Sequence, residues 1–150
     1  MAKEIERKFL VNDDSFKQLA TAKHHICQAY ISADPDGTVR VRIKDDKAFI
    51  TVKTRNHGCV RNEWEYEIPL SDAKEMIAAC RGGVIDKTRY IIPADNGLVW
   101  EIDEFHGRHQ GLVVAEIELP SEDASFALPA FIGQEVTGNP AYYNSSLSQV

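Results

Sequence analysis

Apolar and polar residues alternate with a period of two over most of the chain, a pattern typical of strands that bury one face. Turn residues such as Asp36-Gly37 and Asn96-Gly97 separate these stretches. The predicted strands cover residues 3–11, 26–32, 38–45, 48–55, 59–69, 84–93, 98–105 and 112–119. Eight strands joined mostly by short turns predict an antiparallel sheet that curls or closes on itself.

Short helical segments interrupt the strand pattern. Helices are expected over residues 14–22, 72–80 and 121–128. Ser71 or Asp72 is the predicted cap of the second helix, and Asn139-Pro140 can cap a last short turn. No internal repeat, low-complexity tract or linker divides the sequence, so a single domain over residues 1–150 is expected.

Charged residues on the predicted strands are sorted by sign. Residues i and i+2 of a strand share a face, so each set projects to one side. The basic sets are Arg40, Arg42 and Lys44, then Lys53 and Arg55, then Lys87 and Arg89. The acidic sets are Glu63, Glu65 and Glu67, then Glu101 and Asp103, then Glu116 and Glu118, while the first strand carries Glu4, Glu6 and Lys8.

Two interpretations of this sorting stay open. In any single strand, alternating charge is typical of the solvated face of a half-buried sheet with cross-strand salt bridges. Rows of like charge repel one another, however, and the whole set favours ligands of opposite charge between them. The simplest such ligands are a multivalent anion held by Arg and Lys, and divalent cations held by the carboxylates.

The residue types suit phosphate chemistry. Arginine presents a planar fork of donors to phosphate oxygens, and lysine adds a mobile point charge. Carboxylate oxygens suit Mg²⁺ or Mn²⁺, which keep waters and phosphate oxygens as further ligands. Phosphoryl transfer depends mainly on positioning and charge stabilisation, which this collection of groups could supply.

Composition narrows the setting of this chemistry. The 150 residues carry 17 Lys and Arg against 23 Asp and Glu, a net charge of −6 that argues against a dedicated nucleic-acid binder. No apolar run approaches the roughly 18 residues of a membrane span, and the N-terminal residues have no apolar core of a secretory signal. The cysteines, Cys27, Cys59 and Cys80, form no paired framework, so reduced thiols and a cytoplasmic location are expected.

The residues EIERK at 4–8 have the pattern ExExK, and with it the chain resembles the CYTH superfamily, the triphosphate tunnel metalloenzymes. The likeness looks closest to the short prokaryotic branch, which is inorganic triphosphatase-like. It continues in order through EIERKFLV at 4–11, QAYIS at 28–32, VRVRIK at 39–44, ITVKT at 50–54, RNEWEYEI at 61–68, DKTRY at 86–90, WEIDEF at 100–105, AEIEL at 115–119 and EVTG at 135–138.

This resemblance implies an α+β, mainly β fold, a closed eight-stranded antiparallel β-barrel or tunnel with short helices outside. It implies hydrolysis of inorganic tripolyphosphate to diphosphate and phosphate with Mg²⁺ or Mn²⁺, and Tyr30 as general base. The implied phosphate-binding residues are Lys8, Arg40, Arg42, Lys53, Lys87 and Arg89. The implied metal-binding residues are Glu4, Glu6, Glu63, Glu65, Asp103, Glu116 and Glu118, with Glu101 a weaker candidate.

Alternatives to this function remain. They are a nucleoside or thiamine triphosphatase, a class IV-type adenylate cyclase, and a polyphosphate-binding module without turnover. Gly138-Asn139-Pro140-Ala141 stands where basic residues are common in the family, which leaves any substrate preference inferred from that segment open. The outward pair Trp64 and Tyr66 fits either packing beneath a helix or the contact of a homodimer.

Overall fold

The computed structural model describes residues 3–148 and consists mainly of strands. The strands are β1 (Lys3–Val11), β2 (Ala22–Ser32), β3 (Gly37–Lys44), β4 (Lys47–Thr54), β5 (Val60–Ile68), β6 (Ile85–Pro93), β7 (Val99–Phe105), β8 (Val113–Glu118) and β9 (Ile132–Glu135). The helices are α1 (Leu70–Ala79) and α2 (Asn144–Leu147), with short 3₁₀ turns η1 (Ser15–Leu19), η2 (Asp95–Gly97), η3 (Gly107–His109) and η4 (Pro140–Tyr142). Within the described residues no helix is long and apolar enough to cross a membrane.

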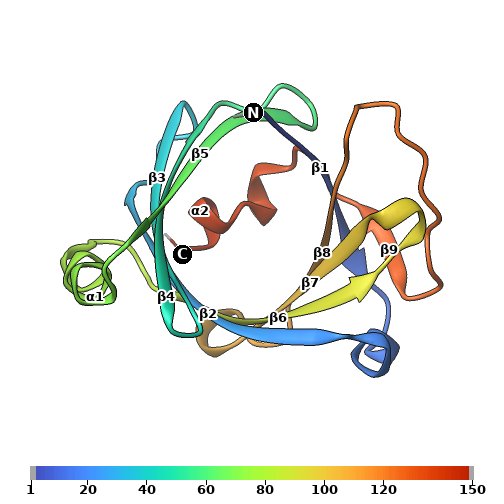
Figure 1. Ribbon diagram of the computed structural model, residues 1–150, viewed down its shortest axis with the longest axis horizontal. Coiled ribbons are helices and arrows are strands. Elements are labelled where there is room, and N and C mark those ends of the chain that lie inside the picture. The colour runs from blue at the N-terminus through green and yellow to red at the C-terminus, as the bar shows by residue number, and fades with distance from the viewer. Residues whose placement is uncertain (1–2, 149–150) are drawn as a thin grey trace.

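Eight antiparallel strands close into a barrel, as the sequence predicts. The order is β5-β4-β3-β2-β6-β7-β8-β1, and β1 returns to β5 through the pairs Lys3–Asn62, Glu4–Arg61 and Ile5–Val60. Figure 1 looks into the ring that these strands form. The ninth strand, β9, pairs with the far half of β1 at Phe9 and Val11, beyond the point where β5 leaves it.

The alternation within each strand decides which side chains face the barrel interior. In β3 the β-branched residues Val39, Val41 and Ile43 face outward, while Arg40 and Arg42 face inward with Lys53 of the adjacent β4. A two-residue turn joins β3 to β4, and its Asp45 has a φ of 55°, a left-handed conformation that Asp tolerates better than most residues. The interior is therefore polar along most of its length.

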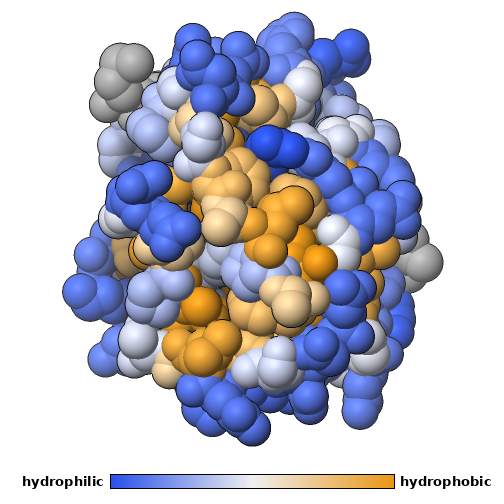
Figure 2. Space-filling view, turned by 90° about the vertical axis from the view of Figure 1, so that its right-hand side faces the viewer, coloured by the Kyte–Doolittle hydropathy of each residue, from blue (hydrophilic) through white to orange (hydrophobic). Residues whose placement is uncertain are grey.

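The hydrophobic core lies mainly outside the barrel wall. On one side α1 packs with Met76 and Ile77 against Val41 and Ala48 of the wall. On the other side Phe9, Trp100, Ile102 and Ile117 pack beneath Phe16, Phe126 and Phe131, and the rings of Phe9 and Trp100 meet edge to face at 5.6 Å. On the side that Figure 2 faces, apolar surface remains visible among hydrophilic residues.

Three predictions about helices and their packing need correction. The segment over 121–128 is not helical: it runs along the barrel wall with Phe126 anchored against the rings of Phe9 and Trp100, and only a turn forms at its start. Helix α1 begins at Leu70, after Pro69, and no side chain caps it. Trp64 and Tyr66 lie exposed on the outer wall rather than under a helix, because α1 packs on β2, β3 and β4.

The C-terminal segment closes one end of the barrel. In Figure 1 η4 and α2 lie within the outline of the ring. At this end the inner wall becomes apolar, and Leu147 packs against Ile85, Phe105 and Val114. Gly83 donates its backbone N–H to the carbonyl oxygen of Ser148, and a Cβ on Gly83 would lie 2.7 Å from that oxygen. The approach therefore requires glycine at position 83.

Candidate functional site

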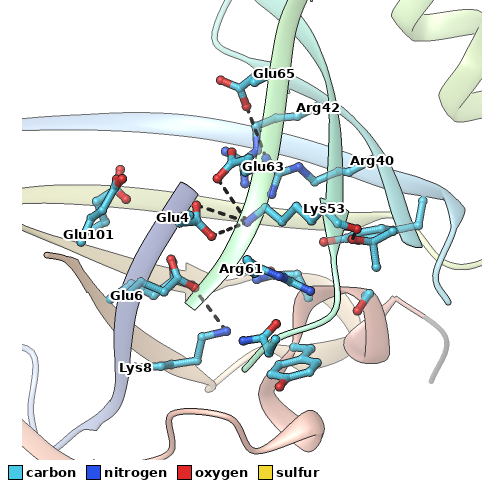
Figure 3. Close-up of a pocket in the computed structure, with 18 of the residues that line it drawn as sticks. Glu4, Glu6, Lys8, Arg40, Arg42, Lys53, Arg61, Glu63, Glu65 and Glu101 are labelled. Carbon is cyan, nitrogen blue, oxygen red and sulfur yellow. Dashed lines mark hydrogen bonds and ion pairs between the residues drawn. The ribbon is translucent and has the colours of Figure 1, made fainter. Parts of the chain in front are cut away.

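A cavity of about 480 Å³ occupies the barrel interior. It is lined by inward-facing side chains of the strands and by residues of the C-terminal segment. Twelve of the fourteen side chains predicted from the sequence line it: Glu4, Glu6, Lys8, Tyr30, Arg40, Arg42, Lys53, Glu63, Glu65, Arg89, Glu116 and Glu118. Figure 3 shows Arg40, Arg42, Arg61 and Lys53 on one side of the cavity, with Glu4, Glu6 and Glu101 on the other.

The basic side of the cavity has one buried donor that its neighbours leave without a partner. Arg40 is 7% exposed, and its Nη2 donates to Thr51 Oγ1 at 3.1 Å and lies 3.5 Å from Glu65 Oε2, but its buried Nε has no hydrogen-bond partner among the described residues. Burial and the nearby charges of Arg40 and Arg89 lower the pKa of Arg42 to about 9. A buried donor without a partner costs free energy, so this wall is suited to receive an anion.

On the acidic side, carboxylates are crowded beyond what the local cations neutralise. Lys53 Nζ lies 3.1 Å from Glu4 Oε1, yet burial and a hydrogen bond with Glu63 raise the pKa of Glu4 to about 7. Burial and repulsion from Glu116 and Glu4 raise the pKa of Glu6 to about 8. A bound cation would relieve this repulsion, which makes the acidic side complementary to the basic one.

The carboxylates fit a divalent cation that shares its coordination with a substrate. No group of three or more His, Cys, Asp or Glu side chains within residues 3–148 forms a ready-made metal cage. Mg²⁺ usually takes one or two carboxylates and completes its shell with water and phosphate oxygens. The carboxylates of the close pair Glu4 and Glu63 provide such donors, and so does that of Glu6, which Glu116 repels.

Two predicted site residues, Lys87 and Asp103, do not line the cavity. Their side chains are on the inner face as expected, but they are covered by neighbours and by the C-terminal segment. Lys87 Nζ lies 2.7 Å from Asp103 Oδ2 and donates to Asn144 Oδ1 at 3.0 Å. Both Asp103 oxygens therefore already accept from cations, which leaves this carboxylate poorly placed to bind a metal as well.

Asp103 instead anchors Arg89. The guanidinium of Arg89 donates from Nε to Oδ1 at 2.7 Å and from Nη2 to Oδ2 at 2.9 Å. Burial acts to raise the pKa of Asp103, but the charges and hydrogen bonds of Arg89 and Lys87 outweigh it and hold the pKa well below its usual range. Arg89 also reaches Glu101 Oε2 at 3.4 Å, and both residues face the cavity.

Tyr30 lines the cavity with its side chain largely buried. Its hydroxyl oxygen accepts a hydrogen bond from Gln28 Nε2 at 3.4 Å. Tyr30 stands on β2, which pairs with β3, the strand that carries Arg40 and Arg42. The hydroxyl is thus held by a second residue and lies beside the basic wall.

Several lining residues were not expected from the sequence. Arg61 shares the inward face of β5 with Glu63 and Glu65, so the period-two pattern contained a signal for it. Tyr143 has Lys8 Nζ 5.7 Å and the Arg61 guanidinium carbon 5.9 Å from its ring centre. Lys8 Nζ also donates to the carbonyl oxygen of Tyr142 at 3.1 Å. No periodicity in the C-terminal segment announces this contribution.

Comparison with known proteins identifies a family and relatives of this chain. The family model described as CYTH domain matches residues 2–150. An inorganic triphosphatase of Acetivibrio thermocellus is 49% identical over 148 residues, 98% of this chain and 94% of that protein. An inorganic triphosphatase of Nitrosomonas europaea is 33% identical over 148 residues, covering 97% of this chain and 96% of the other.

Solved structures agree with the fold. A crystal structure of an inorganic triphosphatase is 31% identical, with a TM-score of 0.71 over 100% of this chain and 97% of the other. A protein from Pyrococcus horikoshii is 22% identical, with a TM-score of 0.64 over 80% of each chain, and supports the fold alone.

Proposed function

The chain belongs to the CYTH domain family, and from this premise we propose that it hydrolyses inorganic tripolyphosphate to diphosphate and phosphate with a divalent metal. Both relatives named above are inorganic triphosphatases, which are hydrolases, and the chain is accordingly an enzyme. We further propose that residues 1–150 act as one catalytic domain.

One observation carries the proposal: the cavity brings together basic side chains with an unused donor and carboxylates that their cations compensate only in part. The unpartnered Arg40 Nε belongs to the first set, and the raised pKa values of Glu4 and Glu6 belong to the second. A triphosphate with its metal supplies both complementary charges. A plain anion-binding module would have no use for the carboxylates, which would weaken its affinity.

Five cavity residues would hold the phosphate chain: Lys8, Arg40, Arg42, Lys53 and Arg89. Arg61 faces the same cavity and is added to this set. Lys87 is covered and would not touch the substrate. It would act only indirectly, through its ion pair with Asp103. Guanidinium groups that are fixed before binding favour one orientation of the terminal phosphate, which is the positioning that phosphoryl transfer requires.

The carboxylates proposed to hold the metal are Glu4, Glu6, Glu63, Glu65, Glu116 and Glu118. When bound, Mg²⁺ or Mn²⁺ polarises phosphoryl oxygens and makes a coordinated water more acidic. Glu116 lies 3.6 Å from Lys8 Nζ, so the two walls meet at this pair.

Tyr30 is the proposed general base. In its ionised form the Tyr30 oxygen would accept a proton from the attacking water, whose oxygen forms the new bond to the terminal phosphorus. The bond between that phosphorus and the bridging oxygen breaks, and the electron pair leaves with diphosphate. The cations of the basic wall stabilise the charge that develops on the phosphoryl oxygens.

The test is phosphate release from tripolyphosphate, ATP and thiamine triphosphate, each with Mg²⁺, Mn²⁺ or a chelator. The proposal expects metal-dependent release from tripolyphosphate well above that from the other two. Dominant release from ATP or thiamine triphosphate would replace the substrate. Cyclic AMP formed from ATP, detected by chromatography, would replace the reaction, and tight binding of tripolyphosphate without turnover would favour the binding module.

A further inference from the structure

Gln28 lies on the inward face of β2, the face that it shares with Tyr30, and is fully buried beneath its neighbours. It stands on β2, where its backbone faces Arg42 on β3 and Ile85 on β6. It is absent from the cavity lining and therefore has no direct access to a substrate in this arrangement. A buried amide is costly unless its polar atoms are used, so its two hydrogen bonds need an explanation.

The first of these bonds fixes the orientation of the amide. Arg42 Nε lies 2.9 Å from Gln28 Oε1. A guanidinium nitrogen can only donate, so the amide atom that faces it must be the oxygen. The two ends of a glutamine amide are often exchangeable, but here Arg42 removes that freedom.

The second bond follows from the first. With the oxygen turned to Arg42, the NH₂ group of Gln28 faces Tyr30 and donates to its hydroxyl oxygen at 3.4 Å. A hydroxyl oxygen that accepts one hydrogen bond from a buried neighbour on its own strand can still form further hydrogen bonds toward the cavity. An N–H donor also stabilises the tyrosine oxygen in its negatively charged form, the form in which this oxygen can take a proton.

We propose that Gln28 is a positioning residue for Tyr30: its amide, oriented by Arg42, holds the tyrosine oxygen in place for proton transfer. This rests on the function proposed above, because it acts through the role of Tyr30 there. It joins the basic wall, which binds the phosphate chain, to the residue that handles the proton, through a single side chain that touches neither substrate nor metal.

Two substitutions at position 28 share one loss and differ in the rest. Gln28→Met keeps the length of the side chain and loses both hydrogen bonds, while Gln28→Glu keeps an acceptor for Arg42 and loses only the donor toward Tyr30. Each is made in the wild-type chain and in a Tyr30→Phe chain, and kcat and KM for tripolyphosphate are measured. Gln18→Met, at an exposed position of η1, is the matched control.

In the wild-type background both substitutions lower kcat at least about tenfold, the effect of one lost hydrogen bond to a charged oxygen. In the Tyr30→Phe background the same substitutions change kcat less than about twofold, because their target is gone. KM rises with Gln28→Met, which also releases Arg42. Gln18→Met leaves both constants unchanged, and thermal melting confirms that each variant is folded.

The contrary outcomes are distinguishable. Equal losses of kcat in both backgrounds would overturn the inference and leave the triphosphatase intact, since Gln28 would then act on the barrel or on Arg42 alone. Wild-type kcat in Tyr30→Phe would remove the proposed base and the inference with it. Absence of phosphate release by the wild-type protein would overturn the proposed function itself.

Discussion

Arg89 and Asp103 form a bidentate ion pair inside the barrel wall, with N–O distances of 2.7 and 2.9 Å. Arg89 lines the cavity, whereas Asp103 does not. The two hydrogen bonds fix the orientation of the Arg89 guanidinium, so the covered carboxylate positions a cation that faces the cavity.

Asp103→Asn should therefore destabilise the protein strongly. It leaves Lys87 and Arg89 buried with reduced compensation, and breaking one member of a buried pair costs about 3–5 kcal/mol. Urea unfolding at neutral pH measures the change. Asp36→Asn, which removes the partner of Arg55 from an exposed ion pair, is the control and should cost less than about 1 kcal/mol. Similar costs for the two variants would contradict the buried role of Asp103.

Arg40→Ala should weaken substrate binding. Arg40 lines the cavity, its buried Nε has no partner within residues 3–148, and a charge-assisted hydrogen bond to phosphate contributes about 1.5–3 kcal/mol. That range corresponds to a rise in KM for tripolyphosphate of about ten- to hundredfold. Arg55→Ala, on the outer surface, is the control. If the two alanine variants had equal KM values, Arg40 would not be a phosphate ligand.

The metal-free protein should lose stability as the pH rises from about 5 to 7, below the range in which the lowered pKa of Lys87, about 7, acts in the opposite direction. The folded-state pKa values of Glu4 and Glu6, about 7 and about 8, lie above the ordinary value of 4.5. The folded state thus binds more protons than the unfolded chain in this window, and its advantage falls as they dissociate. Thermal melting with a chelator at several pH values measures the slope.

Mg²⁺ or Mn²⁺ should reverse this trend, because a divalent cation replaces the dissociated protons. The increase in melting temperature on adding metal is expected to be larger at pH 8 than at pH 6. The variant Glu4→Gln with Glu6→Gln should flatten both the slope and the metal effect. A metal effect that is the same at both pH values, or that survives the double substitution, would place the cation elsewhere.

Gly83→Ala should displace the C-terminal segment, because its Cβ would lie 2.7 Å from the carbonyl oxygen of Ser148. Overpacking of this kind costs about 1–3 kcal/mol, or roughly 2–4 °C of melting temperature for each kcal/mol in a chain of this size. KM should rise as well, since Tyr143 and Asn144 line the cavity. Gly37→Ala, with no atom within 4 Å of its Cβ, is the control. Equal melting temperatures would show that the segment adjusts freely.

Much of the fold was predictable because one rule, the alternation of side chains along a strand, applies to every strand of a closed barrel. Arg40 and Val41 fall on opposite faces as the sequence indicates, and the signs of the charges indicate which face is the interior. The same rule predicts that Arg61 faces the cavity, because it shares a face of its strand with Glu63.

The sequence pattern is least informative where the position of a side chain depends on contacts distant in sequence. Lys87 and Asp103 obey the alternation, but Asn144, 57 residues from Lys87, helps to cover them. The segment over 121–128 has the composition of a helix, yet Phe126 is held against Phe9 and Trp100 in an extended path. Strand β9 has only four residues and shows no period, and it forms because β1 offers it a free edge.

The apolar core outside the wall and the charged lumen within it divide each strand between two tasks. Val41 packs under α1 while its neighbours Arg40 and Arg42 face the cavity. The inward-facing and outward-facing residues can therefore evolve separately. Substitutions at the inward-facing positions can change which anionic substrate is bound, while the outward-facing positions keep the barrel folded. In such a barrel, mutations can change substrate specificity without an equal loss of folding stability.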